Sequence, residues 1–294
     1  MIEKHAYLIM AHNECGLLNK LIKSIDDERN DIFIHVDRKA DYRINDLYRP
    51  QRSNLFSIKQ TNIQWGGDTQ IKCEMNLLKA ACKKGHYSYY HLVSGVDLPI
   101  KSQDEIHEFF KKNRGKNYIK IDPVAMKSSY HYERIRYYYF FQNLIGKKHG
   151  HIVGIVYKLQ ALTLSLQKKM RINRLKKCSK VFYKGTNWFS ITDEMVQEIL
   201  REESFIKKYC YCSLCADEIF VQTVAMNSDL KGTIVDQDLR CIDWKRGNPW
   251  IWTREDATYL LSQNSNLFAR KFSDKVDESI SNFIIEKISG GCNF

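Results

Sequence analysis

Closely spaced carboxylates and thiols are the first places to look for chemistry in this chain of 294 residues. Asp236 and Asp238 flank a single residue, a spacing at which two carboxylates can share one divalent cation. Because they precede a predicted strand instead of ending one, we expect no metal there. Three cysteines within residues 210–215 offer thiolates, but zinc needs a fourth ligand, and no histidine is near them in the sequence. We expect these thiols to be reduced, and either buried or without a specific role.

The sequence lacks four common signatures of catalytic or nucleotide sites. It has no P-loop pattern and no Gly-x-Gly-x-x-Gly, so the usual phosphate-cradling loops are missing. It has no His-Glu-x-x-His pair and no Gly-x-Ser-x-Gly nucleophile elbow. These absences argue against P-loop enzymes, dinucleotide-dependent enzymes, zinc proteases of that type and α/β-hydrolases.

The positive charge is concentrated in one part of the chain. The formal net charge is +12, yet residues 134–192 contain 13 Lys or Arg and no Asp or Glu. The rest of the chain has 33 basic and 34 acidic residues and is therefore almost neutral. Such a local excess favours one anionic partner and argues against general coating of nucleic acid, so we expect no nucleic-acid binding.

Strand-like and helix-like patterns alternate through the first hundred residues. Short β-rich runs end in polar residues at His12, Asp37 and Asp97, and helical spacing of apolar residues lies between them. This order predicts an α/β fold with a mixed, mostly parallel sheet flanked by helices. Ligands of such folds bind beyond the carboxyl ends of the strands, which are where these three polar residues are expected.

The second half is predicted to be mainly helical, at 152–177, 191–203, 216–228 and 277–289. Without linkers or repeats, we expect one domain over 1–294 with a basic helical insert at about 143–187. No apolar run approaches the roughly 20 residues that a membrane span needs, and the start of the chain does not resemble a secretory signal. A cytoplasmic protein is the expectation.

Eight short runs, taken together and in order, resemble the core-2/I-branching β-1,6-N-acetylglucosaminyltransferase family, which includes the peptide O-xylosyltransferases. The resemblance covers roughly residues 4–275, and the chain looks like a compact bacterial member without the membrane anchor and stem of eukaryotic members. The runs are HVDRKA (35–40), QWGGDTQ (64–70), HLVSGVDLPIKS (91–102), ERIRYYYFF (133–141), KGTNWFSIT (184–192), CADEIF (215–220), LRCIDW (239–244) and LFARKF (267–272).

The resemblance implies a GT-A type fold and an inverting transfer of a sugar from a UDP-sugar, with no metal and no other cofactor. Glu218 matches the family's general base, which takes the proton of the acceptor hydroxyl. Its alternative role is that of a carboxylate favoured by the dipole at a helix start. The donor is expected to be UDP-N-acetylglucosamine, with UDP-xylose as the alternative.

Two cations match the family's metal-free stabilisation of the departing diphosphate, namely Arg240 and Lys271. The alternative is that both are ordinary surface cations. Asp37 matches the residue that reads the uridine or ribose, and its other reading is an exposed carboxylate at a strand end.

Five further positions are assigned to the nucleotide side by the same resemblance. Ala11 and His12 are expected to line the uracil pocket, and Trp65 with Gly66 belongs to the nucleotide-side loop, where glycine allows close backbone approach. Asp97 matches a position near the donor sugar. The alternatives are a core role for Trp65 and a turn role for Asp97 before Pro99.

The acceptor, a glycan or lipid-linked glycan, is assigned four contacts: Arg134 and Arg136, which match basic positions loosely, and Trp188 and Trp244, whose rings could stack on a sugar. Burial in the core is the alternative for both tryptophans.

The basic insert carries a further hypothesis. Its apolar residues from Ile152 to Leu166 precede eight Lys or Arg between 168 and 184, so the helix could lie on the anionic inner face of a membrane. The alternative is a helix packed on the domain with a solvated basic end. Two further classes compete with the enzyme as a whole: a non-catalytic sugar-binding module and a nucleic-acid-binding protein.

Overall fold

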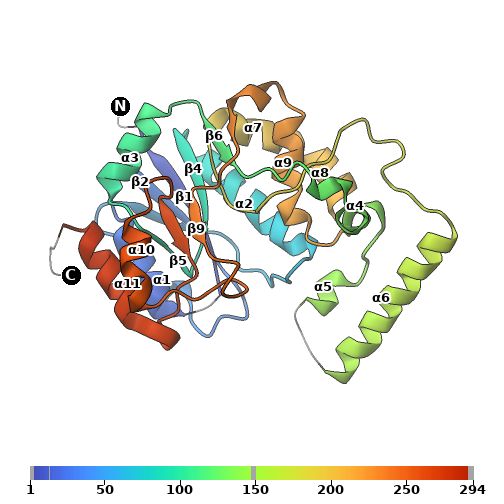
Figure 1. The fold of residues 1–294 in the computed structure, drawn as a ribbon, viewed down its shortest axis with the longest axis horizontal. Helices are drawn as coiled ribbons and strands as arrows, with labels where there is room; N and C mark the ends of the chain where they lie inside the picture. The colour runs from blue at the N-terminus through green and yellow to red at the C-terminus, as the bar shows by residue number, and fades with distance from the viewer. Residues whose placement is uncertain (1–2, 13, 147–149, 291–294) are drawn as a thin grey trace.

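A seven-stranded sheet forms the centre of the computed structural model, which describes residues 3–12, 14–146 and 150–290 (Figure 1). In spatial order its strands are β3 (Asn54–Ser57), β2 (Asn30–Val36), β1 (His5–Ala11), β4 (Tyr89–Ser94), β7 (Phe189–Ile191), β6 (Asn117–Ile119) and β8 (Ile234–Val235).

The sheet is mixed and mostly parallel. Strands β3, β2, β1 and β4 run parallel to one another, β7 is antiparallel to both of its neighbours, and β8 is parallel to β6. Every residue of β2 and of β4 is buried, as expected for strands covered on both faces. The predicted α/β class with a mostly parallel sheet is therefore confirmed.

Two hydrophobic cores, one on each face, hold helices against the sheet. Side chains alternate along β1, so that Tyr7 and Ile9 join one core while Ala6 and Leu8 join the other. The first core takes α1 (Cys15–Ser24), α3 (Gln103–Lys112), α10 (Ala257–Leu261) and α11 (Asp274–Ile288). The second core takes α2 (Asp68–Lys84), α7 (Asp193–Arg201), α8 (Glu203–Cys210) and α9 (Phe220–Met226).

A smaller sheet of three strands belongs to the first core. Its order is β5 (Asp97–Pro99), β10 (Phe268–Arg270) and β9 (Arg240–Ile242), with β10 parallel to β9 and antiparallel to β5. Because β5 follows β4 after a two-residue turn, this sheet places the end of β10 beside the end of β4. Short 3-10 turns complete the chain: η1 (Ile44–Asp46), η2 (Ala125–Lys127), η3 (Ala216–Glu218), η4 (Asp229–Thr233) and η5 (Arg254–Asp256).

The basic segment forms helices that stand to one side of the sheet in Figure 1, namely α4 (Ser129–Arg136), α5 (Gln142–Ile145) and α6 (His151–Lys169). The helix expected over 152–177 ends at Lys169, where Arg171 adopts a left-handed φ of 53°. The helix expected over 216–228 is broken at Ile219 into η3 and α9. No helix within the described ranges is both long and apolar enough to cross a bilayer.

Candidate active site at the carboxyl ends of the strands

The carboxyl ends of β1, β2 and β4 meet at one edge of the large sheet. The backbone N–H of Asp37 donates to the carbonyl of Ala11 over 2.8 Å, and Gly95 donates to Met10 over 3.0 Å. A Cβ added at Gly95 would lie only 3.1 Å from the Cβ of Ala11, so the two strand ends approach closely. The structure therefore brings together the predicted nucleotide-side residues Ala11, His12 and Asp37.

Asp37 is buried and holds the loop that follows its strand. Its carboxylate accepts hydrogen bonds from the backbone N–H of Lys39 at 2.9 Å and of Ile63 at 3.1 Å. The ammonium of Lys39 lies 3.6 Å from the same carboxylate. Asp37 is thus not the exposed strand-end carboxylate of the alternative reading, and its contact with a uridine or ribose stays a prediction.

Asp97 is a buried anchor for a cation at the same edge. It accepts from the backbone N–H of Ser94 at 2.7 Å and from the guanidinium of Arg270 at 2.8 Å. The Arg270 guanidinium lies 4.8 Å from the ring centre of Trp188, which is only 9% exposed. The expected stacking of Trp188 on a sugar is therefore wrong, because its ring is buried and a cation lies over one face.

The charges of three nearby cations act on His12. Loss of solvent lowers the pKa of His12; the Asp37 carboxylate raises it again, and the charges of Lys39, Arg270 and Lys271 lower it further. The neutral imidazole is thus favoured near neutral pH, in a pocket whose added charges are mainly positive. Such an edge attracts a negatively charged group such as a diphosphate.

Glu218 ends η3 and projects into a group of cations. One of its oxygens, Oε2, lies 3.1 Å from the Arg134 guanidinium and 3.1 Å from the Lys184 ammonium. The side chain is 35% exposed, so Glu218 can meet a ligand from solvent. Both contacts use Oε2, which leaves Oε1 without a hydrogen bond to any residue in the described ranges.

The loop with Trp65 and Gly66 packs against the segment that carries Glu218. The backbone N–H of Cys215 donates to the carbonyl of Gly66 at 2.8 Å, and Gln142 donates to the carbonyl of Trp65 at 3.1 Å. Gly66 has a φ of +70°, and an added Cβ would lie 3.0 Å from the sulfur of Cys215. Both features require glycine here. The indole of Trp65 is 49% exposed, so the alternative core role for Trp65 is wrong.

Two buried carboxyl groups lie behind Glu218. Burial, and then the charge of Glu218, raise the pKa of Asp217 to about 7. Burial, and then Asp217, raise the pKa of Glu74 well above its usual value. The amide of Gln70 donates to one Asp217 oxygen at 3.1 Å, and the other oxygen is buried without a partner among the described residues. The pair is therefore expected to hold a proton at neutral pH.

Residues 184–188 connect the two groups. Lys184 lies at the Glu218 carboxylate, and four residues later Trp188 lies beneath Arg270. The backbone N–H of Gly185 also donates to the carbonyl of Glu218 at 2.9 Å. The donor-side residues and the predicted base are thus joined by one short segment.

Arg240 is a buried structural residue and is not placed beside Lys271. In the ladder between β9 and β10, Arg240 lies opposite Phe268, the first residue of β10. Lys271 follows the end of β10, about 10 Å further along the strand. Its guanidinium donates to the carbonyl oxygens of Leu92 at 2.8 Å and Phe189 at 3.2 Å. The expected pairing of Arg240 and Lys271 on one diphosphate is therefore corrected, because the guanidinium is committed to the core.

Two of the other predicted acceptor contacts differ in their surroundings. Arg136 extends over the ring of Tyr137 at 5.2 Å, and its Nε is buried without a partner among the described residues, so it does not join Arg134 at Glu218. Trp244 follows β9 and is 58% exposed, which keeps a ring available for stacking.

The acidic pair considered for a metal has other partners. Asp236 accepts from the backbone N–H of Ile121 at 2.7 Å, and Asp238 accepts from the hydroxyl of Thr186 at 2.7 Å. Across the ranges that the structure describes, no three His, Cys, Asp or Glu side chains form a group able to hold a metal ion. Metal-independent chemistry stays a prediction.

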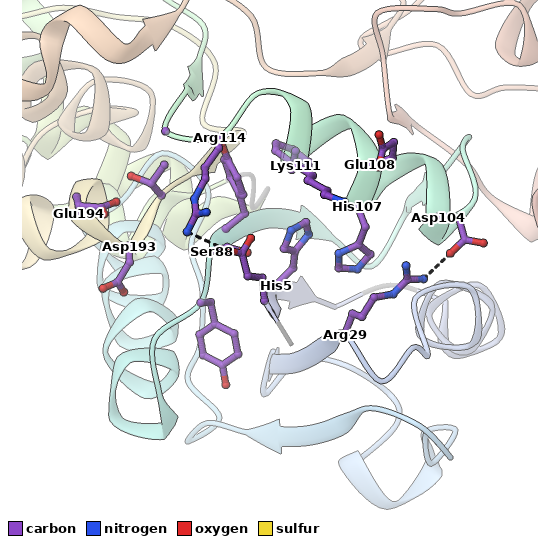
Figure 2. Close-up of a pocket in the computed structure, with 16 residues that line it drawn as sticks. His5, Arg29, Ser88, Asp104, His107, Glu108, Lys111, Arg114, Asp193 and Glu194 are labelled. Atoms are coloured by element: carbon purple, nitrogen blue, oxygen red, sulfur yellow. Dashed lines mark hydrogen bonds and ion pairs between the residues drawn. The ribbon is translucent and has the colours of Figure 1, made fainter. Parts of the chain in front are cut away.

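A cavity of about 720 Å³ lies at the opposite, amino-terminal edge of the sheet (Figure 2). In it His5 stacks on His107 with ring centres 4.1 Å apart, and Arg29 pairs with Asp104 at 2.7 Å. Behind it a hydrogen-bonded chain runs from His5 through His91 and Ser190 to Arg240. None of the predicted site residues lines this cavity.

Sequence analysis missed two residues that the structure places at the site. Lys184 contacts the Glu218 carboxylate, and Arg270 contacts Asp97. Both lie inside the runs KGTNWFSIT and LFARKF that carried the resemblance. The two runs therefore marked the right segments, but the sequence did not indicate which cation of each run faces a carboxylate.

Known proteins similar to this chain are glycosyltransferases. The chain is 22% identical to xylosyltransferase 2 from Rattus norvegicus in an alignment 303 positions long, which covers 94% of this chain and 32% of that protein. It is 21% identical to human N-acetyllactosaminide beta-1,6-N-acetylglucosaminyl-transferase in an alignment 295 positions long, which covers 91% of this chain and 67% of that protein. The chain therefore spans about a third of the length of the xylosyltransferases that it matches.

A likeness to the solved structure of TarS from S. aureus has a TM-score of 0.28 at 15% identity and covers 40% of this chain and 21% of that chain. The model of the family described as "Branch: Core-2/I-Branching enzyme" matches residues 5–260, which is most of the sequence. This chain belongs to the Core-2/I-branching enzyme family.

Proposed function

We propose that this protein is an inverting glycosyltransferase of the GT-A type that moves a sugar from a UDP-sugar to a hydroxyl group of a glycan, with a β linkage. The observation that carries the proposal is the environment of Glu218. Its carboxylate is partly exposed and fixed through one oxygen by two cations, in a chain of the Core-2/I-branching enzyme family.

Glu218 acts as the general base in this proposal. Its Oε1 takes the proton of the acceptor hydroxyl while the acceptor oxygen bonds to the anomeric carbon. The bond between that carbon and the diphosphate oxygen breaks on the opposite face, and UDP leaves with the electron pair. Arg134 and Lys184 hold Oε2, so that the unbound oxygen keeps a fixed direction. A positioned base typically contributes about 10²–10⁴ in rate.

Lys271, with Arg270 beside it in the chain, neutralises the charge that develops on the diphosphate. Cations preorganised at the site where charge appears stabilise the transition state without a metal ion. The loop with Trp65 and Gly66, together with Asp37 and His12, holds the nucleotide. Trp244 and the cations around Glu218 face the acceptor.

The donor is proposed to be UDP-N-acetylglucosamine. The relatives include an N-acetylglucosaminyltransferase and xylosyltransferases, so UDP-xylose is the second candidate. Hydrolysis of each UDP-sugar by the purified protein, measured as release of UDP, distinguishes the two donors.

The test is the substitution Glu218→Gln, which keeps the shape of the side chain and removes its basicity. Turnover of the preferred donor should fall by about 10²–10⁴ while UDP binding changes less than threefold. Glu133→Gln is the matched control, because Glu133 is a similarly exposed carboxylate that pairs with Lys168 outside this group. Equal turnover in the Glu218→Gln variant and the unchanged protein would remove Glu218 as the base.

A further inference from the structure

The two most deeply buried side chains of helix α6 are polar. The buried residues of α6 are Gln160 and Gln167. Gln160 accepts from the backbone N–H of Phe141 at 2.9 Å, and Gln167 bonds both the N–H and the carbonyl of Tyr138, at 2.8 and 2.9 Å. Hydrogen bonds to the backbone of the 138–141 segment, together with the partly buried Val153, Val156 and Leu164, therefore hold this helix to the domain.

The apolar side chains of α6 form a stripe on the solvent side. It consists of Ile152, Ile155, Leu159, Leu162 and Leu166, which are 45–79% exposed. Their spacing alternates three and four residues, so all five lie within about 80° of one another around the helix axis, away from both glutamines. In Figure 1 the helix runs along the outer edge of the molecule, with α5 as its nearest helix. A soluble helix ordinarily buries such a stripe.

Lysines border the apolar stripe. Lys158 is three residues from Ile155 and four from Leu162, and Lys169 is three from Leu166, so both flank the stripe on the helix surface. Lys158, Lys169 and Arg171 are exposed and form no ion pair with any residue in the described ranges. The whole stretch 134–192 contains no acidic residue.

Other cations of the basic stretch are not available to a partner. Arg174 donates to the carbonyl of Tyr211 at 2.9 Å and lies 4.4 Å from the ring centre of Tyr138. Lys168 pairs with Glu133 and Lys180 with Glu202. Structural contacts thus occupy several of the eight Lys or Arg between residues 168 and 184. Lys147 and Lys148, which precede α6, lie outside the described residues.

Two occupants would cover the stripe, and charge distinguishes them. The spacing of three and four residues also suits a second copy of the same helix. In that pair, however, lysines would flank the seam from both helices with no carboxylate to oppose them, and like charges there repel. An anionic surface with an apolar interior can bury the apolar stripe and attract the lysines at the same time.

We infer that α6 docks this protein on an anionic membrane surface, with the apolar stripe in the acyl boundary and Lys158, Lys169 and Arg171 at the lipid headgroups. The helix has 19 residues and is about 28 Å long, enough to lie along the interface. Anionic lipids are concentrated in the cytoplasmic leaflet, which makes the inner face the docking side. Such docking would bring the enzyme to acceptors carried on lipids.

The test is sedimentation of the full chain with vesicles of phosphatidylcholine containing 30% phosphatidylglycerol. Binding should weaken at least tenfold for the double variant Leu159→Gln and Leu162→Gln, because two leucines leave the acyl boundary. Changing Lys158, Lys169 and Arg171 to Gln should weaken it about 100-fold, at roughly 1 kcal/mol per cation. Neither set belongs to the catalytic group, so UDP release from soluble donor should be unchanged in both.

Tyr157→Gln is the matched control, since Tyr157 is 64% exposed on α6 but lies on the opposite side of the helix from the stripe. This variant should bind vesicles as the unchanged protein does. Equal loss with Tyr157→Gln, or no dependence on phosphatidylglycerol, would overturn the inference. A concentration-dependent dimer in sedimentation velocity that Leu159→Gln abolishes would assign the stripe to a second copy instead.

Discussion

Neighbouring carboxyl groups with opposite surroundings are the main feature of the site at the scale of single residues. Asp217 is buried, and its pKa is raised to about 7 by burial and then by Glu218. Glu218, the next residue, is a third exposed and contacts two cations. Adjacent carboxyl groups with such different surroundings are typical of sites where one carboxyl stays protonated while the other reacts.

Asp217 should make stability depend on pH. Its pKa in the folded protein lies above that of the unfolded chain, so the folded state holds a proton between about pH 4 and 7 that the unfolded state releases. The free energy of unfolding should therefore fall as pH rises through this window, by a few kcal/mol at most. Asp217→Asn should remove much of that decline in urea titrations at pH 4.5, 6 and 8. Asp41→Asn, on an exposed loop, is the control, and parallel profiles for Asp217→Asn and the unchanged protein would refute the assignment.

Arg240 and Lys271 should respond differently to substitution by methionine. Arg240→Met leaves the carbonyl groups of Leu92 and Phe189 without their donor, so the free energy of unfolding should fall by about 2–4 kcal/mol. Lys271→Met should cost less than about 1 kcal/mol of stability but weaken UDP binding at least tenfold, because a charged contact is lost. Denaturant titration and calorimetry measure the two effects. A stable Arg240→Met variant with weakened UDP binding would restore the role expected from the sequence.

At the scale of elements, function depends on how loops are held against each other. The loop of Trp65 and Gly66 and the segment of Cys215 and Glu218 share a backbone hydrogen bond of 2.8 Å between Cys215 and Gly66. Helix α2 begins at Asp68, directly after the first loop, and carries Gln70, which contacts Asp217. One helix start therefore supports both the nucleotide-side loop and the segment of the proposed base.

Gly66→Ala should disturb this contact. The alanine would have to keep the left-handed φ of Gly66, and its methyl group would lie 3.0 Å from the Cys215 sulfur. We therefore expect the free energy of unfolding to fall by about 1–3 kcal/mol. Turnover should fall as well, because the segment of Glu218 shifts. Gly154→Ala is the control: it lies inside α6 with no atom within 4 Å of the added Cβ, and it should gain up to about 1 kcal/mol. Unchanged turnover in Gly66→Ala would separate this loop from catalysis.

On the scale of the whole molecule, the two edges of the sheet differ in character. The carboxyl edge gathers His12, Asp37 and Lys271 around an electropositive region. The opposite edge holds the cavity of Figure 2, whose charged residues include the pairs Arg29–Asp104 and Arg114–Glu3. The candidate site therefore does not coincide with that cavity, and α6 lies to the side of both.

UDP should stabilise the folded protein without a metal ion. At a concentration 100 times its dissociation constant, a ligand adds about 2.7 kcal/mol, which for a chain of this size raises the melting temperature by about 5 °C. The same shift is expected in EDTA and in Mn²⁺, because side-chain cations are proposed to meet the diphosphate. Thermal unfolding with UDP under both conditions measures this, and stabilisation that appears only with Mn²⁺ would contradict the proposed role of Lys271.

The sequence by itself determined the α/β class, the strand ends directly before His12 and Asp37, the family, and the concentration of charge in one stretch. These features follow from local patterns, since strands buried on both faces read as short apolar runs and their polar ends mark the carboxyl edge.

Only the tertiary structure decided which cations face carboxylates. The sequence does not distinguish the roles of Arg240, Arg270 and Lys271. The pairing of β9 with β10 places Arg240 opposite Phe268 with its guanidinium in the core, and the pairing of β10 with β5 places Arg270 opposite Asp97. It also decided that α6 presents its apolar stripe to solvent, because Gln160 and Gln167 bond backbone groups of the neighbouring segment on another side of the helix. Side-chain direction depends on contacts between residues far apart in the chain, which spacing along the sequence does not record.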